Sequence, residues 1–424
     1  MRLKAPVFLA ACLLFFSHLP LQLNAQDGYG NIADYLDKIY KIDDNAGLTA
    51  FPILNIPMGG RAEGMGMAFS AVSDDVSFIE YNPAGSSMLS TSEFALFHNN
   101  WIADVKIESL AYAAKIKDLG IAVGAKWLYT TFTENNLYAA RVSNGYYSEG
   151  VATLNASYNF LSGFYFPGIS VGVSLKGAFR IMPDYTDDWD TIISGSGMSQ
   201  SSLMGMADIG FLTRFNLFKF YTAREKNASA AFVIRNLGPT SKGEALPTVM
   251  SAAIAYKPIR PLLFAFDFNL PVNLKEISSS EKPNASLGIS ANITKFLSMH
   301  AGVNYRPGSS RFYVGSAIYL NKIAIDINYT LDLLTQWQPL NRLSLGVRLD
   351  LGDGGKQQRS NKAEELYLLG LEAYSRGNVA DARLCWEEAL RIEPRYEPAK
   401  ESLEMLEKRQ GLIQRVDELN SLDF

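Results

Sequence analysis

The sequence predicts an all-β transmembrane barrel of about 14 antiparallel strands, preceded by an N-terminal plug and followed by a small all-α domain. Three observations lead to this fold class. Apolar and polar residues alternate with a period of two through residues 93–351. A glycine-rich stretch without this alternation, residues 57–89, comes directly before them. After Leu351 a short polar stretch leads into a helical period.

Residues 1–25 have the features of a secretory signal peptide. A positively charged start is followed by an apolar run and by a cleavage position at Ala25. The residues ending at Cys12 also resemble a lipoprotein cleavage box, but cleavage there would cut the apolar run in half. Export would leave Cys385 without a second cysteine, so no intrachain disulfide is expected.

Residues 26–56 are predicted to carry one short amphipathic helix on the periplasmic side. Ile32, Leu36 and Ile39 recur at helical spacing within residues 30–44. The simplest interpretation is a helix that covers the end of the next element.

Residues 57–91 are predicted to form a compact coil that fits inside a closed sheet. Glycines permit positive φ and close backbone approach, and Asn-Pro is a turn signal. The residues expected to build this plug are Gly59, Gly60, Gly64, Gly66, Asp74, Asp75, Asn82, Pro83 and Ala84. Two alternatives are a bland glycine-rich loop and a phosphate-binding loop. No Gly-Lys-Ser/Thr follows the glycines, which disfavours the second.

Residues 92–351 are predicted to be the barrel. In the segment 341–351, Leu343, Leu345 and Val347 alternate with polar partners, so one face meets lipid and the other the lumen. Because every backbone group in hydrocarbon must be paired, such a sheet has to close. The predicted strands are 93–101, 106–117, 120–132, 149–161, 167–181, 202–217, 228–237, 248–257, 261–272, 284–293, 297–306, 311–320, 322–331 and 341–351.

The connections between these strands alternate between short and long. Those at 118–119, 257–260, 294–296 and 321 are short, and those at 133–148, 182–201, 238–247 and 273–283 are longer and polar. Outer-membrane barrels have short periplasmic turns and longer external loops. In a soluble β-sandwich no such difference in loop length between the two ends is expected.

Residues 352–361 are predicted to be a linker, and residues 362–410 one tetratricopeptide-type repeat with a capping helix. Residues 411–424 are predicted to be a tail. The residues expected to pack the repeat are Leu366, Leu369, Gly370, Tyr374, Ala382, Trp386, Ala389 and Pro394. Because about three copies are normally needed for stability, a single repeat should lean on the periplasmic rim of the barrel, on another copy or on a partner.

The composition disfavours several functions. Charged residues make up 19% of the chain and the net charge is −4, so a basic nucleic-acid footprint is not expected. The sequence has no recognisable Ser-His-Asp set and no nucleotide loop, and its three histidines lack metal-ligand spacing. We therefore predict no enzyme activity, no cofactor and no metal.

Residues 57–351 resemble the FadL-like outer-membrane proteins, which include long-chain fatty acid channels and a PorV-like branch tied to secretion. The resemblance rests on GGRAEGMG at 59–66, AFSAVSDD at 68–75 and YNPAG at 81–85. It implies fourteen strands with an N-terminal hatch in the lumen, and places Asn82, Pro83 and Ala84 in the hatch turn. The terminal repeat departs from the simple fatty acid channel.

The resemblance implies passive uptake of long-chain fatty acids or other hydrophobic molecules across an outer membrane, with a periplasmic repeat that binds a protein partner. No residue of the sequence identifies the ligand-binding site. An alternative is a PorV-like scaffold for envelope or secretion complexes, and a second alternative is a general porin, which the hatch disfavours.

Overall fold

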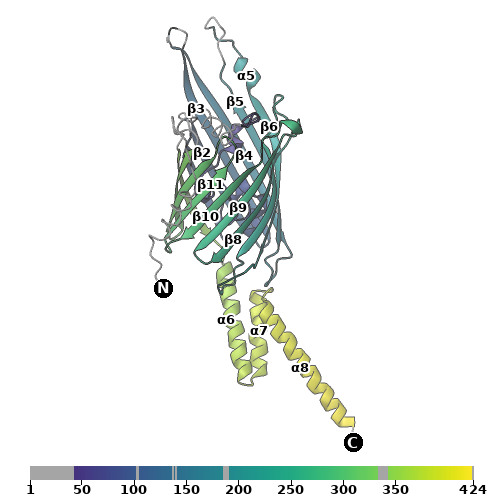
Figure 1. Ribbon diagram of the computed structural model, residues 1–424. Coiled ribbons are helices and arrows are strands. Elements are labelled where there is room, and N and C mark those ends of the chain that lie inside the picture. The colour runs from purple at the N-terminus through teal and green to yellow at the C-terminus, as the bar shows by residue number, and fades with distance from the viewer. Residues whose placement is uncertain are drawn as a thin grey trace, which may run out of the picture. The chain divides into compact units, whose positions relative to one another are not determined.

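The computed structural model describes residues 43–101, 105–135, 138, 141–184, 191–332 and 342–422 (Figure 1). The predicted signal peptide and nearly all of the predicted helix at 30–44 lie outside these residues. Among them no helix has both the length and the apolar character to cross a membrane.

Fourteen antiparallel strands form one closed barrel, in which each strand pairs with its neighbours in sequence and β1 pairs with β14 (Figure 1). This confirms the predicted architecture and strand number. The strands are β1 Ser92–Asn100, β2 Lys106–Ile116, β3 Leu119–Asn135, β4 Arg141–Phe160, β5 Ile169–Ile181, β6 Ser202–Phe215, β7 Ala228–Leu237, β8 Thr248–Ile259, β9 Leu262–Val272, β10 Asn284–Asn292, β11 Leu297–Tyr305, β12 Arg311–Leu320, β13 Ile323–Asp332 and β14 Arg342–Gly352.

The two faces of each strand separate as the alternation indicates. Leu345 on β14 is 43% exposed on the outside, whereas its neighbour Ser344 is fully buried toward the lumen. On β10, Leu287 is 57% exposed and Ser286 is buried. The outer face of the barrel therefore carries exposed apolar side chains, while polar side chains and some large apolar ones, such as Phe97 and Leu212, face inward.

The largest difference in strand bounds is at the β3–β4 hairpin. Pairing continues through Thr130↔Tyr147 and Phe132↔Gly145, so both strands run well into the predicted loop at 133–148. Most residues there are polar, and those of β3 are exposed, so no alternating apolar face marks where the strands end.

The two ends of the barrel differ, and we name them by their connections. The loop end carries residues 182–201, 238–247 and 273–283, and the turn end carries the tight β2–β3, β8–β9, β10–β11 and β12–β13 turns. Two connections at the turn end, residues 161–168 and 216–227, are longer than the alternation of loop lengths predicts.

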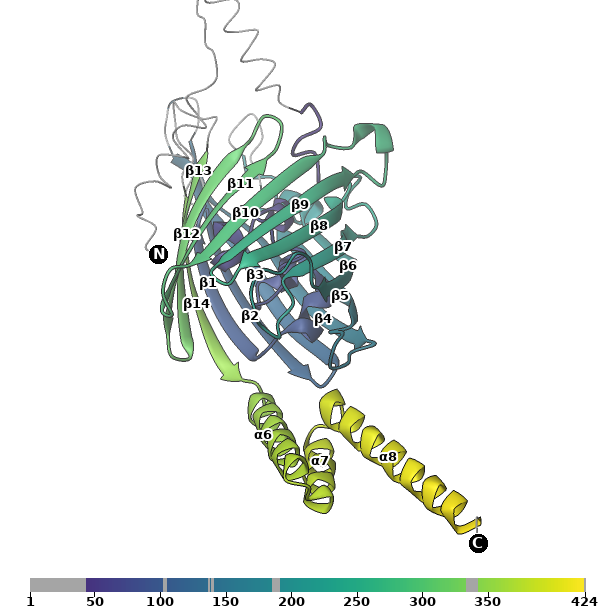
Figure 2. The same cartoon turned by 60° about the horizontal axis from the view of Figure 1, so that its bottom comes forward.

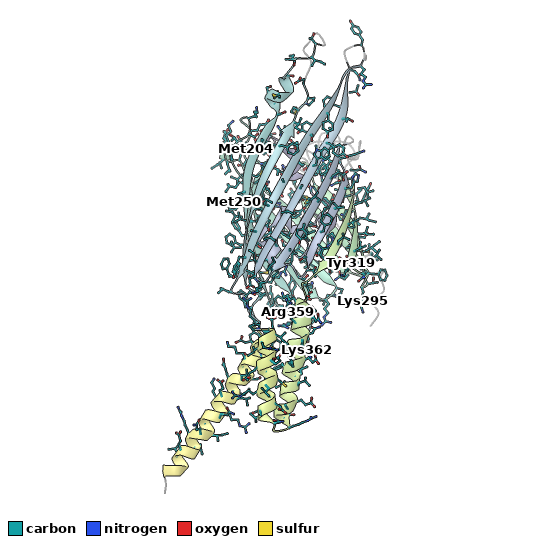
Figure 3. The ribbon with its side chains drawn as sticks, turned by 180° about the vertical axis from the view of Figure 1, so that it is seen from behind. Met204, Met250, Lys295, Tyr319, Arg359 and Lys362 are labelled. Carbon is teal, nitrogen blue, oxygen red and sulfur yellow. The ribbon has the colours of Figure 1, made fainter. Side chains whose placement is uncertain are left out.

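The described chain enters the barrel at the loop end. Ala50 N–H donates to Ala245 O at 2.8 Å, and Gly47 N–H donates to Glu281 Oε1 at 3.1 Å. The C-terminal helices begin after β14 at the opposite, turn end, and Arg359 and Lys362 lie on the first of them, below the barrel in Figure 3. Residues 26–56 and the C-terminal domain were both predicted on the periplasmic side. For residues 43–56 this prediction was wrong, because the chain crosses the lumen before β1.

Three helices follow the barrel: α6 Lys356–Ser375, α7 Val379–Ile392 and α8 Glu397–Leu422. The predicted linker is shortened to residues 353–355, because Gly354 and Gly355 adopt positive φ and helix-forming residues begin directly after them. The predicted tail is instead helical to Leu422 as part of α8.

Most of the predicted repeat residues form the contact between α6 and α7. A Cβ on Gly370 would lie 2.3 Å from Trp386 Nε1, and Trp386 donates to Tyr367 O at 3.2 Å. Ala382 and Ala389 are fully buried, and Leu366 and Tyr374 pack against them partly buried. Leu369 is 45% exposed, so it is not part of this core, and Pro394 is exposed in the turn before α8.

Candidate functional site

Residues 51–89, here called the lumen segment, lie inside the barrel (Figure 2). The segment contains four short helical turns, η1 Pro52–Asn55, α3 Gly60–Gly64, α4 Phe78–Tyr81 and η2 Pro83–Met88, where a coil was predicted. α3 contacts β11–β14, and η2 contacts β2–β6, so the segment reaches opposite sides of the wall. Every predicted plug residue belongs to this segment.

Much of the barrel wall facing the lumen segment is built from small side chains. Phe69, Met65 and Ala68 pack against Ala253, Ala255 and Ala265 of β8 and β9. Phe78 and Ile79 pack in a second cluster with Ala95, Ala111, Ala113 and Ala122 of β1–β3, to which the wall also contributes Phe97. At the alanines the wall leaves room for the large apolar side chains of the segment.

Glycines on the wall permit direct contact with the backbone of the segment. A Cβ on Gly302 would lie 2.2 Å from Gly66 N, and one on Gly315 would lie 3.0 Å from Gly64 Cα. A Cβ on Gly172 would lie 2.2 Å from Pro83 O. Gly66 also has φ +65°, a conformation that other residues rarely adopt. The sequence prediction did not include these wall glycines. Their occurrence at lumen-facing strand positions is the signal by which they could have been found.

Asp75 joins the segment to the wall through a network of buried ion pairs, and Asp74 extends this network within the segment. Arg348 of β14 contacts Asp75 at 3.2 Å and holds Asp326 of β13 through two bonds of 2.7 and 3.0 Å. Arg61 pairs with Asp74 and lies 3.5 Å from Asp75. Asp75 thus lies between two guanidinium groups, one from the wall and one from its own segment.

Glu63 of α3 is buried, and its hydrogen-bond donors among the described residues are two hydroxyl groups. Thr330 donates to it at 3.1 Å, and Ser344 also donates to it. The wall thus presents neutral donors from β13 and β14 to this carboxylate.

Asn82, which the sequence placed in the hatch turn, fixes the turn that leads into η2. Its Oδ1 accepts from Ala84 N–H at 2.9 Å, and its Nδ2 donates to Ser70 O at 2.8 Å and to Phe211 O at 3.2 Å. Pro83 O accepts from Asn155 Nδ2 at 2.9 Å. Ser86 and Ser157 meet at 2.6 Å between their hydroxyl oxygens. The predicted turn is thus attached to β4 and β6.

Charged wall side chains also bind the backbone of the lumen segment. Asp267 accepts from Ser70 N–H at 2.9 Å, Glu149 from Ile53 N–H at 3.1 Å and Glu93 from Val76 N–H at 2.8 Å. Arg214 donates to Met88 O and Val72 O, both at 3.2 Å. Isolated charges at lumen positions of apolar strands could have identified these residues, but not their partners.

Two adjoining cavities, of about 100 and about 40 Å³, lie between the lumen segment and the wall. Leu54, Glu80, Arg235 and Asn236 line both. The larger cavity reaches the loop end at Asn45 and Glu281, and the smaller one reaches Lys126 and Lys176. Lys126 pairs with Glu80, and Lys176 contacts Asp208 at 2.6 Å. We call the two cavities together the chamber; charged groups line it, and it is open at one end.

No cluster of three or more His, Cys, Asp or Glu side chains suited to a metal ion occurs among the described residues. The arrangement as a whole is a closed wall, a fitted inner segment and a small chamber lined by both charged and apolar side chains.

Comparisons with known proteins place the chain in a family. Residues 33–354 match the uncharacterised protein family UPF0164. A UPF0164 protein of Treponema pallidum (strain Nichols) is 28% identical over 364 residues, covering 82% of this chain and 80% of that protein. Another from the same organism is 25% identical over 403 residues, covering 87% of this chain and 77% of that protein.

Among solved structures, the CymD monoaromatic hydrocarbon channel aligns with a TM-score of 0.46 and 12% identity, over 72% of this chain and 99% of CymD. The Pseudomonas putida toluene transporter TodX aligns with a TM-score of 0.45 and 12% identity, over 68% of this chain and 96% of TodX. The family match covers the lumen segment and the whole barrel, and the chain belongs to the uncharacterised protein family UPF0164.

Proposed function

We propose that this protein is an outer-membrane channel for hydrophobic molecules, closed at rest by the lumen segment. The observation that carries the proposal is the combination of an apolar outer face with a lumen filled by residues 51–89. A closed barrel satisfies every strand hydrogen bond without water, so such a surface is suited to lipid. The predicted signal peptide supports export.

The lumen segment is proposed to act as a hatch. Packing of Phe69 and Phe78 against alanines, together with the Asp75–Arg348 pair, holds it in the closed position. At Gly66–Gly302 the nearest atoms are backbone atoms of the two glycines and their neighbours, without an intervening side chain. Backbone contacts of this kind need no side-chain rearrangement when they separate, which favours a hatch that moves.

The cargo is proposed to be a hydrophobic molecule, with long-chain fatty acids as one candidate class. Burial of each methylene contributes about 0.8 kcal/mol, so a long acyl chain would gain substantially from an apolar path. A dry cavity of about 150 Å³ holds a single benzene ring. The chamber, with parts of about 100 and 40 Å³, is too small for a long chain at rest. Passage of such a cargo therefore requires the hatch to move.

A disulfide that locks the hatch tests this function. The Ser86 and Ser157 hydroxyl oxygens are 2.6 Å apart, one on η2 and one on β4, so cysteines there can bond with little backbone movement. We expect the Ser86→Cys/Ser157→Cys protein, with Cys12 and Cys385 replaced by alanine, to stop fatty acid uptake into liposomes when oxidised. Reduction should restore uptake.

Each single cysteine variant is the matched control, and its uptake should not depend on redox state. Equal uptake in the oxidised and reduced double variant would contradict a hatch that moves at η2. Deleting residues 59–85 should raise ion conductance, and unchanged conductance would contradict a plug.

A second candidate function is a scaffold for envelope or secretion proteins, and the C-terminal helices support it. Leu368 and Leu384 are 56% and 63% exposed on α6 and α7. Deleting residues 356–424 separates the two functions. A channel should keep its lipid uptake, whereas a scaffold should lose pull-down of its partner.

A further inference from the structure

The 216–227 connection, here called the rim loop, is an exception to the short connections of the turn end. It exposes two phenylalanines: Phe218 is 75% exposed and Phe220 is 78% exposed. Phe218 also has φ +39°, a strained backbone conformation for an aromatic residue. Strain and exposure at one residue are retained only where the surroundings fix them.

The rim loop has an ordered internal structure. Asn227 binds Leu217 twice, accepting from its N–H at 2.8 Å and donating to its carbonyl at 2.7 Å. Lys219 Nζ turns inward to donate to the carbonyls of Ala223 and Glu225. A side chain of β8 also holds the loop, since Tyr256 donates to Phe218 O at 2.9 Å. The two phenylalanines are thus presented by a fixed backbone.

The exposed side chains continue the outer apolar face of the barrel. Phe211 and Phe215 of β6 are exposed on that face, and Leu217 follows them into the rim loop. Basic groups lie beside the aromatics: Lys226 is in the loop, and Arg260 donates to Thr222 O at 2.5 Å. Aromatic rings next to cations are typical of the boundary between acyl chains and headgroups.

We propose that the rim loop is a membrane-interface anchor, with Phe218 and Phe220 inserted into the phospholipid leaflet on the side of the turn end. This inference rests on the proposed function, since it requires the barrel to lie in a bilayer. On its other side the loop contacts the 161–168 connection, where the Arg224 guanidinium lies 4.1 Å from the centre of the Phe164 ring. The anchor thereby fixes how deeply the turn end of the barrel lies in the membrane. At that end Phe164 packs against the core of the C-terminal helices.

Site-specific fluorescence in the full chain tests the anchor. Phe218→Cys and Phe220→Cys, made with Cys12 and Cys385 replaced by alanine, are labelled with an environment-sensitive dye. The proteins are reconstituted in phosphatidylcholine and phosphatidylglycerol vesicles with brominated acyl chains. Both dyes should emit at shorter wavelength and lose most of their emission to bromine, but not to aqueous iodide. Glu225→Cys, in the same loop, should show the opposite pattern.

Leu287→Cys on β10 separates the two proposals. If bromine quenches position 287 while iodide quenches 218 and 220, the anchor is overturned and the channel stands. If bromine does not quench 287, the membrane barrel and the anchor are both overturned. Protection of 218 and 220 from both quenchers would show a protein covering them and would overturn the lipid anchor.

A second measurement serves if the labelled variants do not fold. Phe218→Ser/Phe220→Ser should refold into vesicles with a lower yield than the matched Thr222→Ser variant. Equal yields would overturn the anchor.

Discussion

Asp75 of the lumen segment and Arg348 of β14 form an ion pair of 3.2 Å inside the barrel. The same guanidinium holds Asp326 of β13, so one wall residue connects the segment to two strands. In the proposed function this pair closes the hatch, and its strength limits how readily the channel opens.

Removing the cation of this pair should release the lumen segment. Arg348→Met leaves Asp326 buried without its guanidinium partner and Asp75 with Arg61 at 3.5 Å, and removing one partner of a buried ion pair typically costs about 3–5 kcal/mol. We expect a lower free energy of unfolding in urea and faster proteolysis within residues 51–89. Arg376→Met is the control, because Arg376 is 74% exposed at the end of α6 and pairs with Glu372 of that helix. A variant at position 348 as stable and as protease-resistant as this control would contradict the role of the pair.

Replacing a wall glycine should displace the segment without changing any charge. A Cβ at Gly302 would lie 2.2 Å from Gly66 N, between two backbones that have no side chain to move aside. Overpacking of this kind costs about 1–3 kcal/mol. We expect Gly302→Ala to raise single-channel conductance and lower the urea midpoint. In Gly205→Ala, where the new Cβ meets no atom within 4 Å, both should stay at the wild-type value.

The period of two was sufficient to predict the fold. It placed Leu345 outside and Ser344 inside because successive residues of a strand point to opposite faces. It failed at the ends of β3 and β4 that form their hairpin, where most residues are polar and no apolar face marks the strand. The end of helix α8 was predicted too early, because its last turns bury no apolar face that the pattern could reveal. Leu412 and Leu419 there are 63% and 65% exposed.

The candidate site could be predicted only in part. The glycines and carboxylates at 59–75 were visible as an unusual local composition. Their partners were not, because Asp75 and Arg348 are 273 residues apart in sequence. Nor could spacing assign the exposed aromatics at 218 and 220, since these belong to a loop whose conformation depends on Asn227 and Tyr256.

A charge on the outer face should be costly if that face meets lipid. Leu345 lies on the outside of β14, where arginine at mid-bilayer costs about 2–4 kcal/mol. We expect Leu345→Arg to lower the unfolding free energy in vesicles by this amount. Leu384→Arg on α7 is the matched control, since Leu384 is 63% exposed outside the barrel and should tolerate the change. A neutral result at position 345 would contradict a lipid-facing surface.

The contact between the helices and the turn end should depend on pH through Asp118. Arg395, before α8, donates two hydrogen bonds of 2.9 and 2.7 Å to Asp118 in the β2–β3 turn. Those bonds hold the pKa of Asp118 below its ordinary value of 3.8. Because the pKa is lower in the docked state, the stabilisation is fully present above about pH 4 and is lost as pH falls through the lowered pKa.

Acidification below that range, or Asp118→Asn at neutral pH, should therefore loosen the docking of the helices. Since Arg395 is 54% exposed, solvent screening limits the effect to about 1 kcal/mol or less. Protease cleavage within residues 353–355 measures it, because the docked helices restrict access to this short connection. Glu372→Gln, which breaks a pair inside α6, should leave the cleavage rate unchanged. Equal cleavage of the Asp118→Asn and wild-type proteins at neutral pH would show that the contact with Arg395 does not hold the helices.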